Sequence, residues 1–424
     1  MSAPPTLAAQ DWLRAAPLRR LFAAFPPGSL RCVGGCIRDS LAGLPVKDID
    51  LATPLSPDAV MARLRAARIA AVPTGIRHGT VTAVIRHRPY EITTLRHDVE
   101  TDGRHATVAF IDDWEADAAR RDLTINAIYC DADGTLFDPF GGADDLAAGR
   151  VRFVGDAHAR ITEDYLRLMR FFRFHARYGR GAPDAEALAA ARALAPGLAR
   201  LSAERVHDEL MKLLAGPRAD AVLALMAANG ILPHVDPAVR DVDRLARLVA
   251  AETLAAGQLP GVRPDAVRRL AALLGDGAGA GADGIGQRLR LSNKEIKRVG
   301  RALALRPAMS PTHERRTRRL LIYELGAETY RDRCLLRWAS APAEGTAEAW
   351  IVQLAEAESW QQPQFPLGGA DVLDLGVATG PRVGRLLDAV RDWWRDGGFV
   401  ADRESCLAEL RARAALPDGR KLRG

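Results

Sequence analysis

Two aspartates in the stretch KDIDLAT, Asp48 and Asp50, are the first candidates for chemistry. Polar and apolar residues alternate around them, which predicts a strand. Positions i and i+2 of a strand project from one face, so the two carboxylates would lie about 6–7 Å apart. Oxygen ligands at that spacing suit Mg²⁺ and two-metal phosphoryl or nucleotidyl transfer. The alternative is a pair of solvated carboxylates.

A glycine pair, Gly34-Gly35, lies ahead of these aspartates, between a short apolar run and a helical pattern that begins at Gly35. Glycine lets phosphate oxygens approach the backbone N–H groups at the positive end of a helix. Arg38, one turn further on, can add a fixed positive charge. By itself the pair is also typical of a tight turn. Beside a metal-binding strand, it predicts a single active site for nucleotide chemistry.

Asp164, Arg167, Arg170 and Arg173 recur at a spacing of three residues and would form one stripe on a helix. A salt-bridged face in contact with solvent is the ordinary interpretation. However, aspartate only accepts hydrogen bonds and arginine only donates them. Asp164 and Arg167 therefore match cytosine and adenine, which present an amino donor beside a ring-nitrogen acceptor, and mismatch uracil and guanine. Arg170 and Arg173 would support this pair or hold phosphates.

The stretch GGCIRDSLAGLPVKDIDLAT resembles the signature of the tRNA nucleotidyltransferase and bacterial poly(A) polymerase family, class II of the polymerase-β-like nucleotidyltransferases. Further matching blocks follow in order over residues 30–235: HGTVTA, YEITTLRHD, ARRDLTINAIYCDADGTLFDPFGGADDL, ITEDYLRLMRFFRFHARYG and LSAERVHDELMKLL. The resemblance implies an α+β fold, in which a small mixed-sheet nucleotidyltransferase head is followed by an all-α neck, body and tail.

The resemblance also implies roles for individual residues. Asp48 and Asp50 would be the catalytic Mg²⁺ ligands, and Gly35 and Arg38 would contact the incoming nucleotide. Glu91 is a candidate third carboxylate, and an exposed strand glutamate is the equal alternative.

The ARRD block of the same resemblance gives Arg121 and Asp122 the task of holding phosphate and ribose. A carboxylate such as Asp122 can accept a hydrogen bond from a ribose 2′-OH. Outside this family, the same residues would be only a charged helix start.

The implied activity is the Mg²⁺-dependent addition of CCA to the 3′ end of tRNA from CTP and ATP, with release of pyrophosphate. A poly(A) polymerase is the alternative enzyme, because the same head motifs serve both activities. Enzymes that add only CC or only A, and a catalytically silent RNA-binding protein, are further alternatives. The oligomeric state stays open.

The elements that must position these residues follow from periodicity and turn signals. We expect a leader helix over 1–28, a head over 29–155, a neck for base recognition over 156–238, and a tRNA-binding body and tail over 239–424. In the head we expect helices at 35–41 and 56–67, and a hairpin around Arg88-Pro89.

In the neck, residues 161–179 predict one helix, with Thr162 as the N-cap and Gly179 as the stop, and Ser202 is a candidate cap for the next helix. The glycine-rich stretch at 275–286 predicts a flexible connection. It lies ahead of Arg-rich helices, among them HERRTRR at 313–319, which we expect to bind the tRNA backbone.

Charge and cysteine content agree with this reading. The 424 residues carry a net charge of +6 with a pI near 9.3, which favours a polyanionic partner. Five scattered cysteines predict buried thiols in a reducing cytoplasm and no disulfide framework. We expect no signal peptide and no membrane span.

Two other motifs are weaker. VLDLGVATGPRVGRLL resembles the glycine loop of a methyltransferase, but too little chain follows it for the repeated βαβ units of that fold, so we expect a helix–turn–helix of the tail. His207-Asp208 resembles the metal-binding pair of a phosphohydrolase. No further histidines stand at positions where they could complete a metal site with this pair, so a surface pair on a helix is the preferred interpretation.

Overall fold

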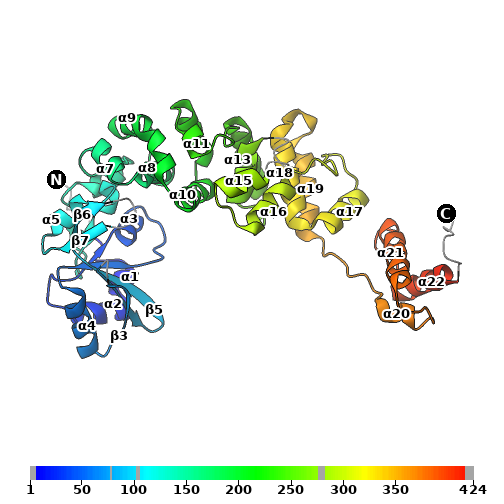
Figure 1. Cartoon of the computed structure of the whole chain (residues 1–424), viewed down its shortest axis with the longest axis horizontal. Helices are drawn as coiled ribbons and strands as arrows, with labels where there is room; N and C mark the ends of the chain where they lie inside the picture. The colour runs from blue at the N-terminus through cyan, green and yellow to red at the C-terminus, as the bar shows by residue number, and fades with distance from the viewer. Residues whose placement is uncertain (1–5, 77–78, 102–105, 276–281, 416–424) are drawn as a thin grey trace. The chain divides into compact units, whose positions relative to one another are not determined.

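The computed structural model describes residues 6–76, 79–101, 106–275 and 282–415. Within these limits all strands lie in one part of the chain, and the remainder is helical (Figure 1). The chain divides into two compact units. The first unit comprises Met1–Asp243, Asp265–Leu274 and Asp283–Asn293, and the second comprises Arg244–Pro264, Gly275–Ala282 and Lys294–Gly424.

The described residues of the first unit form a seven-stranded mixed sheet in the order β3-β4-β5-β2-β1-β8-β9. Only β2 and β5 run parallel within it. Strands β6 and β7 form a separate antiparallel pair. The mixed-sheet head predicted from the sequence is therefore confirmed. The strands are β1 (Arg31–Val33), β2 (Asp50–Thr53), β3 (Ala70–Gly75), β4 (Thr80–Ile85), β5 (Arg88–Thr94), β6 (Arg96–Thr101), β7 (Ala106–Phe110), β8 (Tyr129–Cys130) and β9 (Leu136–Phe137).

The beginning of the chain packs into the core of the head. Two short helices, α1 (Asp11–Arg14) and α2 (Ala16–Ala23), replace the single leader helix expected over 1–28. The helix breaks because Ala15 is extended and a proline occupies the first turn of α2. Leu18 and Leu21 share a buried core with residues of α3 (Gly35–Leu41), α4 (Pro57–Ala66) and the sheet. Helices α3 and α4 agree with the prediction.

Strand β2 begins at Asp50, so the prediction that places Asp48 on the same strand is wrong. The register of the antiparallel β1–β2 pair explains this difference. Its last pair joins Val33 to Asp50, after which the chain turns at Gly34 into α3. Asp48 consequently lies just before the strand, without a backbone partner in β1 to extend it.

The β4–β5 hairpin is confirmed, but its turn lies two residues earlier than predicted. Arg86 and His87 occupy the turn with φ values of 52° and 62°, the two positive values of a type I′ connection. Arg88 and Pro89 are the first residues of β5.

The predicted helix over 161–179 is interrupted. Helix α7 (Ala157–Glu163) is capped by Asp156, whose carboxylate accepts from the Ala159 amide at 2.6 Å. Thr162 is therefore not an N-cap: it lies inside α7, and its hydroxyl donates to the backbone of the preceding turn. Asp164 is extended, with φ −154° and ψ 105°, and helix α8 (Leu166–Tyr178) follows it. Gly179 ends α8 as predicted.

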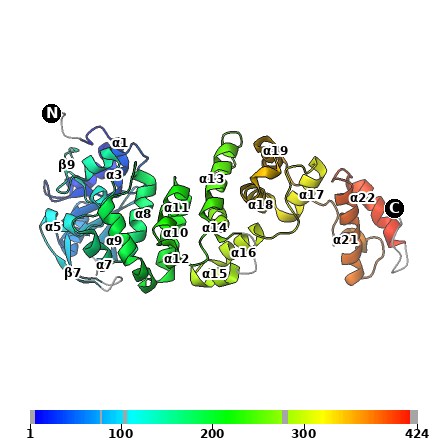
Figure 2. The ribbon, with the colours of Figure 1, turned by 90° about the horizontal axis from the view of Figure 1, so that it is seen from above.

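Helices make up the rest of the described chain. Helices α8, α10 and α11 lie side by side in the first unit (Figure 2). Ser202 is the N-cap of α10 as predicted, without a side-chain capping bond. The remaining helices are α5 (Trp114–Ala119), α6 (Gly142–Ala148), α9 (Ala185–Leu194), α10 (Ala203–Ala215), α11 (Ala219–Ala228), α12 (Leu232–Val235), α13 (Val242–Ala256), α14 (Ala266–Leu274), α15 (Ala282–Arg288), α16 (Asn293–Ala302), α17 (Arg315–Leu325), α18 (Ala327–Ser340), α19 (Ala347–Ser359), α20 (Gly369–Leu373), α21 (Pro381–Asp396) and α22 (Arg403–Ala414).

The methyltransferase-like stretch near the end of the chain is helical. It forms α20 and α21, joined by a turn in which Gly376 has φ 79°. These helices and α22 share a small core that includes Trp394. The predicted helix–turn–helix of the tail is confirmed. Among the described residues, no helix has both the length and the apolar character needed to span a membrane.

Candidate active site

A cavity of about 520 Å³ in the first unit brings most of the predicted site residues together. It lies where β1, β2 and β5 meet the start of α3 and one face of α8. Asp48 is not among the lining residues, whereas Glu91 is. The predicted residues that line the cavity are Gly35, Arg38, Asp50, Arg121, Asp122, Arg170 and Arg173.

Three carboxylates form the acidic part of this site. Asp50 and Glu91 are register partners in the parallel β2–β5 pair, and Asp48 lies just before β2. Loss of hydration and the negative charges of Glu91 and Asp48 raise the pKa of Asp50, and the nearby Arg121 opposes that rise. No described residue forms a side-chain hydrogen bond or ion pair with these carboxylates.

Crowded oxygen donors that no described side chain hydrogen-bonds or ion-pairs fit a divalent cation in their chemistry. Across the described ranges, however, no three acidic, histidine or cysteine groups are arranged to enclose a metal ion. Metal binding at this position therefore stays a prediction.

The glycine turn lies beside these carboxylates. Gly34 has φ 72° and ψ −115°, a backbone conformation that an L-residue rarely adopts, and it caps α3. Arg38 lies one turn into α3 and donates to the Asn126 side chain at 2.6 Å and to Asp39 at 2.8 Å. Its guanidinium also lies over the Phe174 ring at 4.9 Å. These contacts fix a cation at the mouth of the turn.

Arg121 is fixed by a buried network. Its Nε donates to the Tyr129 hydroxyl at 3.0 Å and its Nη2 lies 3.2 Å from Asp117. Burial alone would raise the pKa of Asp117, but Arg121, Arg120 and the Tyr129 hydroxyl together lower it. Asp117 thus stays ionised and holds Arg121 against the cavity wall.

Asp122 is 9% exposed and its hydrogen-bonding capacity is largely used. One oxygen accepts from the amide of Leu123 at 2.8 Å and from Asn126 at 3.0 Å. The other oxygen accepts from Arg170 Nε at 2.7 Å. A carboxylate has about four acceptor positions, so one is left for a ligand. Burial opposes ionisation, but Arg170 and Asn126 lower the pKa of Asp122 overall.

The predicted stripe of Asp164 with three arginines is wrong in one respect, because Asp164 lies outside the helix. Among the described residues, its carboxylate forms no ion pair with the Arg167 guanidinium. Instead, its Oδ2 accepts from Arg205 of α10 at 2.7 Å. Arg167 donates to Glu163 at 2.6 Å. Asp164 and Arg167 still line one pocket, of about 280 Å³.

Two residues of α10 that were not selected from the sequence support this region. One is Arg205, and the other is Glu209, which is 3% exposed and accepts from Arg173 Nε at 2.5 Å. Glu209 also lies 3.9 Å from Arg170. The only sequence signal for these residues is their spacing of four on a helix, which places them on one face.

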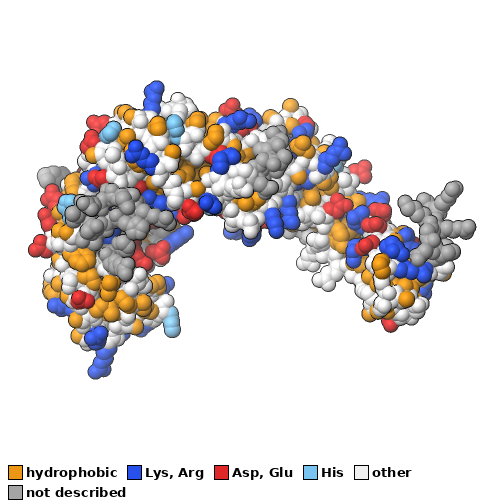
Figure 3. Space-filling model, in the orientation of Figure 1, with side chains coloured by type: hydrophobic (Ala, Val, Ile, Leu, Met, Phe, Trp, Pro, Cys, Tyr) orange, Lys and Arg blue, Asp and Glu red, His pale blue; other side chains and the backbone are white. Residues whose placement is uncertain are grey.

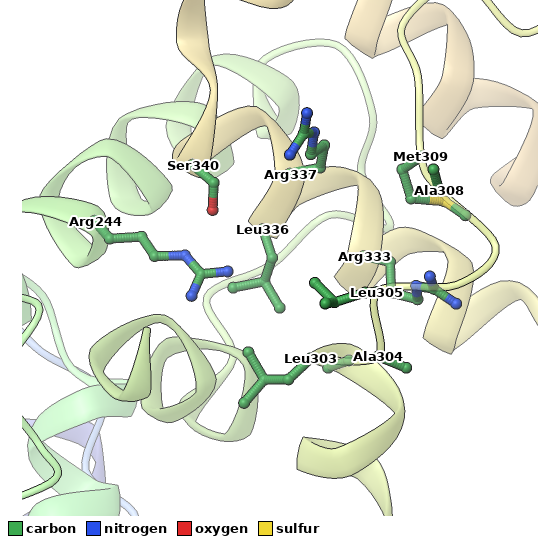
Figure 4. Close-up of a pocket in the computed structure, with 11 residues that line it drawn as sticks. Arg244, Leu303, Ala304, Leu305, Ala308, Met309, Arg333, Leu336, Arg337 and Ser340 are labelled. Carbon is green, nitrogen blue, oxygen red and sulfur yellow. The ribbon is translucent and has the colours of Figure 1, made fainter. Parts of the chain in front are cut away.

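A third cavity, of about 170 Å³, lies in the second unit (Figure 4). Arg244, Arg333 and Arg337 line it together with apolar side chains, and no carboxylate does. This cavity therefore lacks the acidic groups that distinguish the cavity of the head. His207 and Asp208 lie on α10, where His207 Nδ1 is 3.3 Å from Asp208 Oδ1.

Two family models match segments of the first unit. Residues 30–152 match the model described as the poly A polymerase head domain. Residues 182–242 match the model described as the probable RNA and SrmB-binding site of polymerase A. Fold and site together define a nucleotidyltransferase of this head-domain class.

Whole-chain comparisons narrow the class. The chain is 34% identical over 396 residues to the CCA tRNA nucleotidyltransferase 1, mitochondrial, of Danio rerio, covering 90% of this chain and 86% of that protein. It is 40% identical over 222 residues to the CCA-adding enzyme of Geobacillus stearothermophilus, about half of each chain. The crystal structure of the Bacillus stearothermophilus CCA-adding enzyme in complex with CTP superposes with a TM-score of 0.71 at 28% identity, over 96% of this chain and 98% of that one. The chain belongs to the CCA tRNA nucleotidyltransferase family.

Proposed function

We propose that this protein adds C, C and A to the 3′ end of tRNA, using CTP and ATP and releasing pyrophosphate. The observation that carries the proposal is one cavity that combines Asp50, the glycine turn, Arg121 and Asp122, and shares residues with the pocket of Asp164 and Arg167. The whole-length relationship to the Danio rerio enzyme supports it.

Mg²⁺ is the proposed cofactor, held by Asp48 and Asp50, with Glu91 as a candidate third ligand. When bound, it would supply positive charge that favours deprotonation of the RNA 3′-hydroxyl and stabilises negative charge on the phosphate oxygens. The protein's own part is positioning and charge. Arg38 and Arg121 would hold the triphosphate oxygens, since each guanidinium is fixed by hydrogen bonds before a ligand arrives.

Ribose and base would be bound at the other side of the site. Asp122 has one acceptor position left, which suits a ribose 2′-OH. Asp164 would accept the amino hydrogen of cytosine or adenine, and Arg167 would donate to the neighbouring ring nitrogen. Arg170 and Arg173, held by Asp122 and Glu209, would contribute positive charge to the nucleotide pocket.

We propose that helices after residue 239 bind the tRNA backbone. Lys and Arg side chains are spread among Asp and Glu over the visible face (Figure 3). In the HERRTRR stretch, Arg315, Arg318 and Arg319 all lie within 4 Å of Glu356, which offsets part of their charge. Arg316 is exposed and has no ion pair with a described residue, so it is the best placed to contact phosphate.

A poly(A) polymerase is the second candidate, since residues 30–152 match a model described by that activity. One experiment separates the candidates: incubate the protein and Mg²⁺ with tRNA lacking its CCA end, supply each NTP singly and together, and sequence the 3′ ends. Addition of C, C and A followed by arrest supports the proposal. A long A tail from ATP alone refutes it in favour of poly(A) synthesis, and addition of only CC or only A points to the partial activities.

The Asp48→Ala variant tests the metal assignment in the same assay. We expect incorporation to be lost while tRNA binding persists. Asp58→Ala, which removes an exposed carboxylate from the first turn of α4, is the matched control and should retain activity. Wild-type incorporation by Asp48→Ala would contradict the assignment, and activity lost in both variants would show a nonspecific effect.

We propose a cytoplasmic location, supported by five free, buried cysteines. The name of the Danio rerio relative places that protein in mitochondria, so cell fractionation is the deciding measurement.

A further inference from the structure

Arg205 of helix α10 contacts Asp164, one of the two residues proposed to recognise the base. Arg205 lies 41 residues after Asp164 in the sequence, and its Nη2 donates to Asp164 Oδ2 at 2.7 Å. Both side chains are partly buried, with exposures of 27% and 23%. Arg205 also lines the pocket that Asp164 and Arg167 share.

The carboxylate of Asp164 is held at both oxygens. Oδ1 accepts from the Leu166 amide at 3.1 Å, which closes the turn between α7 and α8. Oδ2 accepts from Arg205. With the Leu166 bond alone, the carboxylate could still rotate, because Asp164 has an extended backbone between two helices. The second bond fixes the plane in which the remaining lone pairs can meet a base.

Arg167 is held independently of Arg205. Its Nη1 donates to Glu163 at 2.6 Å and to the Arg160 carbonyl at 3.2 Å. Its Nη2 donates to the Arg120 carbonyl at 3.1 Å. A guanidinium has five N–H donors, so two are left for a ligand after these three bonds. Removal of Arg205 would therefore disturb the acceptor of the pair and leave the donor in place.

We propose that Arg205 is a positioning residue for nucleobase selection: it orients Asp164 so that this carboxylate accepts from the amino group of cytosine or adenine. This inference rests on the proposed function and deepens it. The bond from Arg205 fixes the orientation of the Asp164 carboxylate, whose oxygens accept hydrogen bonds. A carboxylate that stays acceptor-only rejects the O4 of uracil and the O6 of guanine, because acceptor then faces acceptor.

The direct test is nucleotide discrimination by Arg205→Met, which keeps the length of the side chain and removes its charge. CTP is compared with UTP on tRNA lacking CCA, and ATP with GTP on tRNA ending in CC, as ratios of kcat/KM. We expect both ratios to fall at least about tenfold, because a misplaced recognition group loses its selectivity. Arg205→Lys, which retains a donor and a charge, should recover part of each ratio.

Arg192→Met is the matched control. Arg192 is an exposed arginine in the last turn of α9, and the substitution removes the same charge from the same unit without contact to Asp164. Its ratios should stay within about twofold of the wild type. If Arg205→Met lowers kcat for all four nucleotides equally and leaves both ratios unchanged, the inference is wrong and Arg205 has a merely structural role.

Equilibrium binding separates this inference from the proposed function. If the wild-type protein fails to add C, C and A, the proposed function is refuted. The CTP-over-UTP ratio of binding constants, measured by calorimetry in wild type and Arg205→Met, then decides the inference without turnover. Should Arg205→Met not fold, Arg205→Gln takes its place, and an unchanged ratio in that variant overturns the proposal.

Discussion

Asp122 holds Arg170 at the junction of the head with α8, and its removal should cost stability in a pH-dependent way. Asp122→Asn keeps the shape of the side chain but removes its charge and presents an amide to Arg170. Removal of one partner from a buried ion pair costs about 3–5 kcal/mol. Arg170 is 32% exposed and Glu209 lies 3.9 Å from it, and both features soften the loss. We expect unfolding free energy to fall by about 2–3 kcal/mol at pH 7.

The sign of the pH dependence follows from the lowered pKa of Asp122 in the folded protein. A carboxyl group with a lower pKa when folded stabilises the protein above its unfolded pKa, about 3.9. That contribution is lost as the pH falls through the folded value. Because Asp122→Asn lacks the contribution at every pH, the stability gap between variant and wild type should close in acid.

Urea unfolding followed by circular dichroism measures the gap at pH 7 and in steps down to pH 2.5. Asp58→Asn is the control, since this exposed carboxylate has no comparable pair, and it should follow the wild type within about 0.5 kcal/mol. A gap below about 0.5 kcal/mol at pH 7 would refute the assignment of Asp122 as a structural anchor. A gap that persists undiminished in acid would refute its electrostatic origin.

Three further outcomes follow from the structure. Gly34→Ala should lower the free energy of unfolding in urea by about 1–3 kcal/mol, because φ 72° strains any residue with a Cβ. A steric clash is not the cause, since the atom nearest to an added Cβ, the Asn126 carbonyl oxygen, would be 3.6 Å away. Arg316→Glu should weaken tRNA binding and reduce the slope of log K against log salt by about one, whereas an unchanged slope would exclude a phosphate contact there. Burial raises the pKa of Cys130 to about 12. At pH 8 a disulfide reagent should therefore label this thiol only after urea is added, as measured by mass spectrometry. Labelling of Cys130 in the native protein would contradict its buried position.

The family resemblance predicted the fold class and most of the residues that line the cavity, and local patterns predicted several of the elements that position them. The glycine turn, the start of α3 at Gly35 and the β4–β5 hairpin are each defined by a few neighbouring residues. The start of β2 at Asp50, after Asp48, was not predictable in this way. It is determined by where β1 turns into α3, since a strand extends only as far as its partner allows.

The break between α7 and α8 shows a second limit of sequence patterns. The apolar period runs through Asp164 without interruption, so periodicity alone predicts one helix. Asp164 instead bonds forward to the Leu166 amide and across to Arg205, and these bonds compete with helical hydrogen bonds. The competing partner lies on α10, beyond the range of any local signal.

The two pockets of the site share one wall. Arg121, Asp122 and Arg170 line both the cavity that contains Asp50 and the pocket that contains Asp164. A nucleotide bound with its base at Asp164 and its phosphates toward Asp50 would therefore contact this shared wall along its length. Because Asp122 joins the wall to α8 through Arg170, a base that fails to fit Asp164 would also displace the phosphates from their donors. Base selection and nucleotidyl transfer would then be coupled through one ion pair, and Asp122→Asn should weaken CTP-over-UTP discrimination as well as stability.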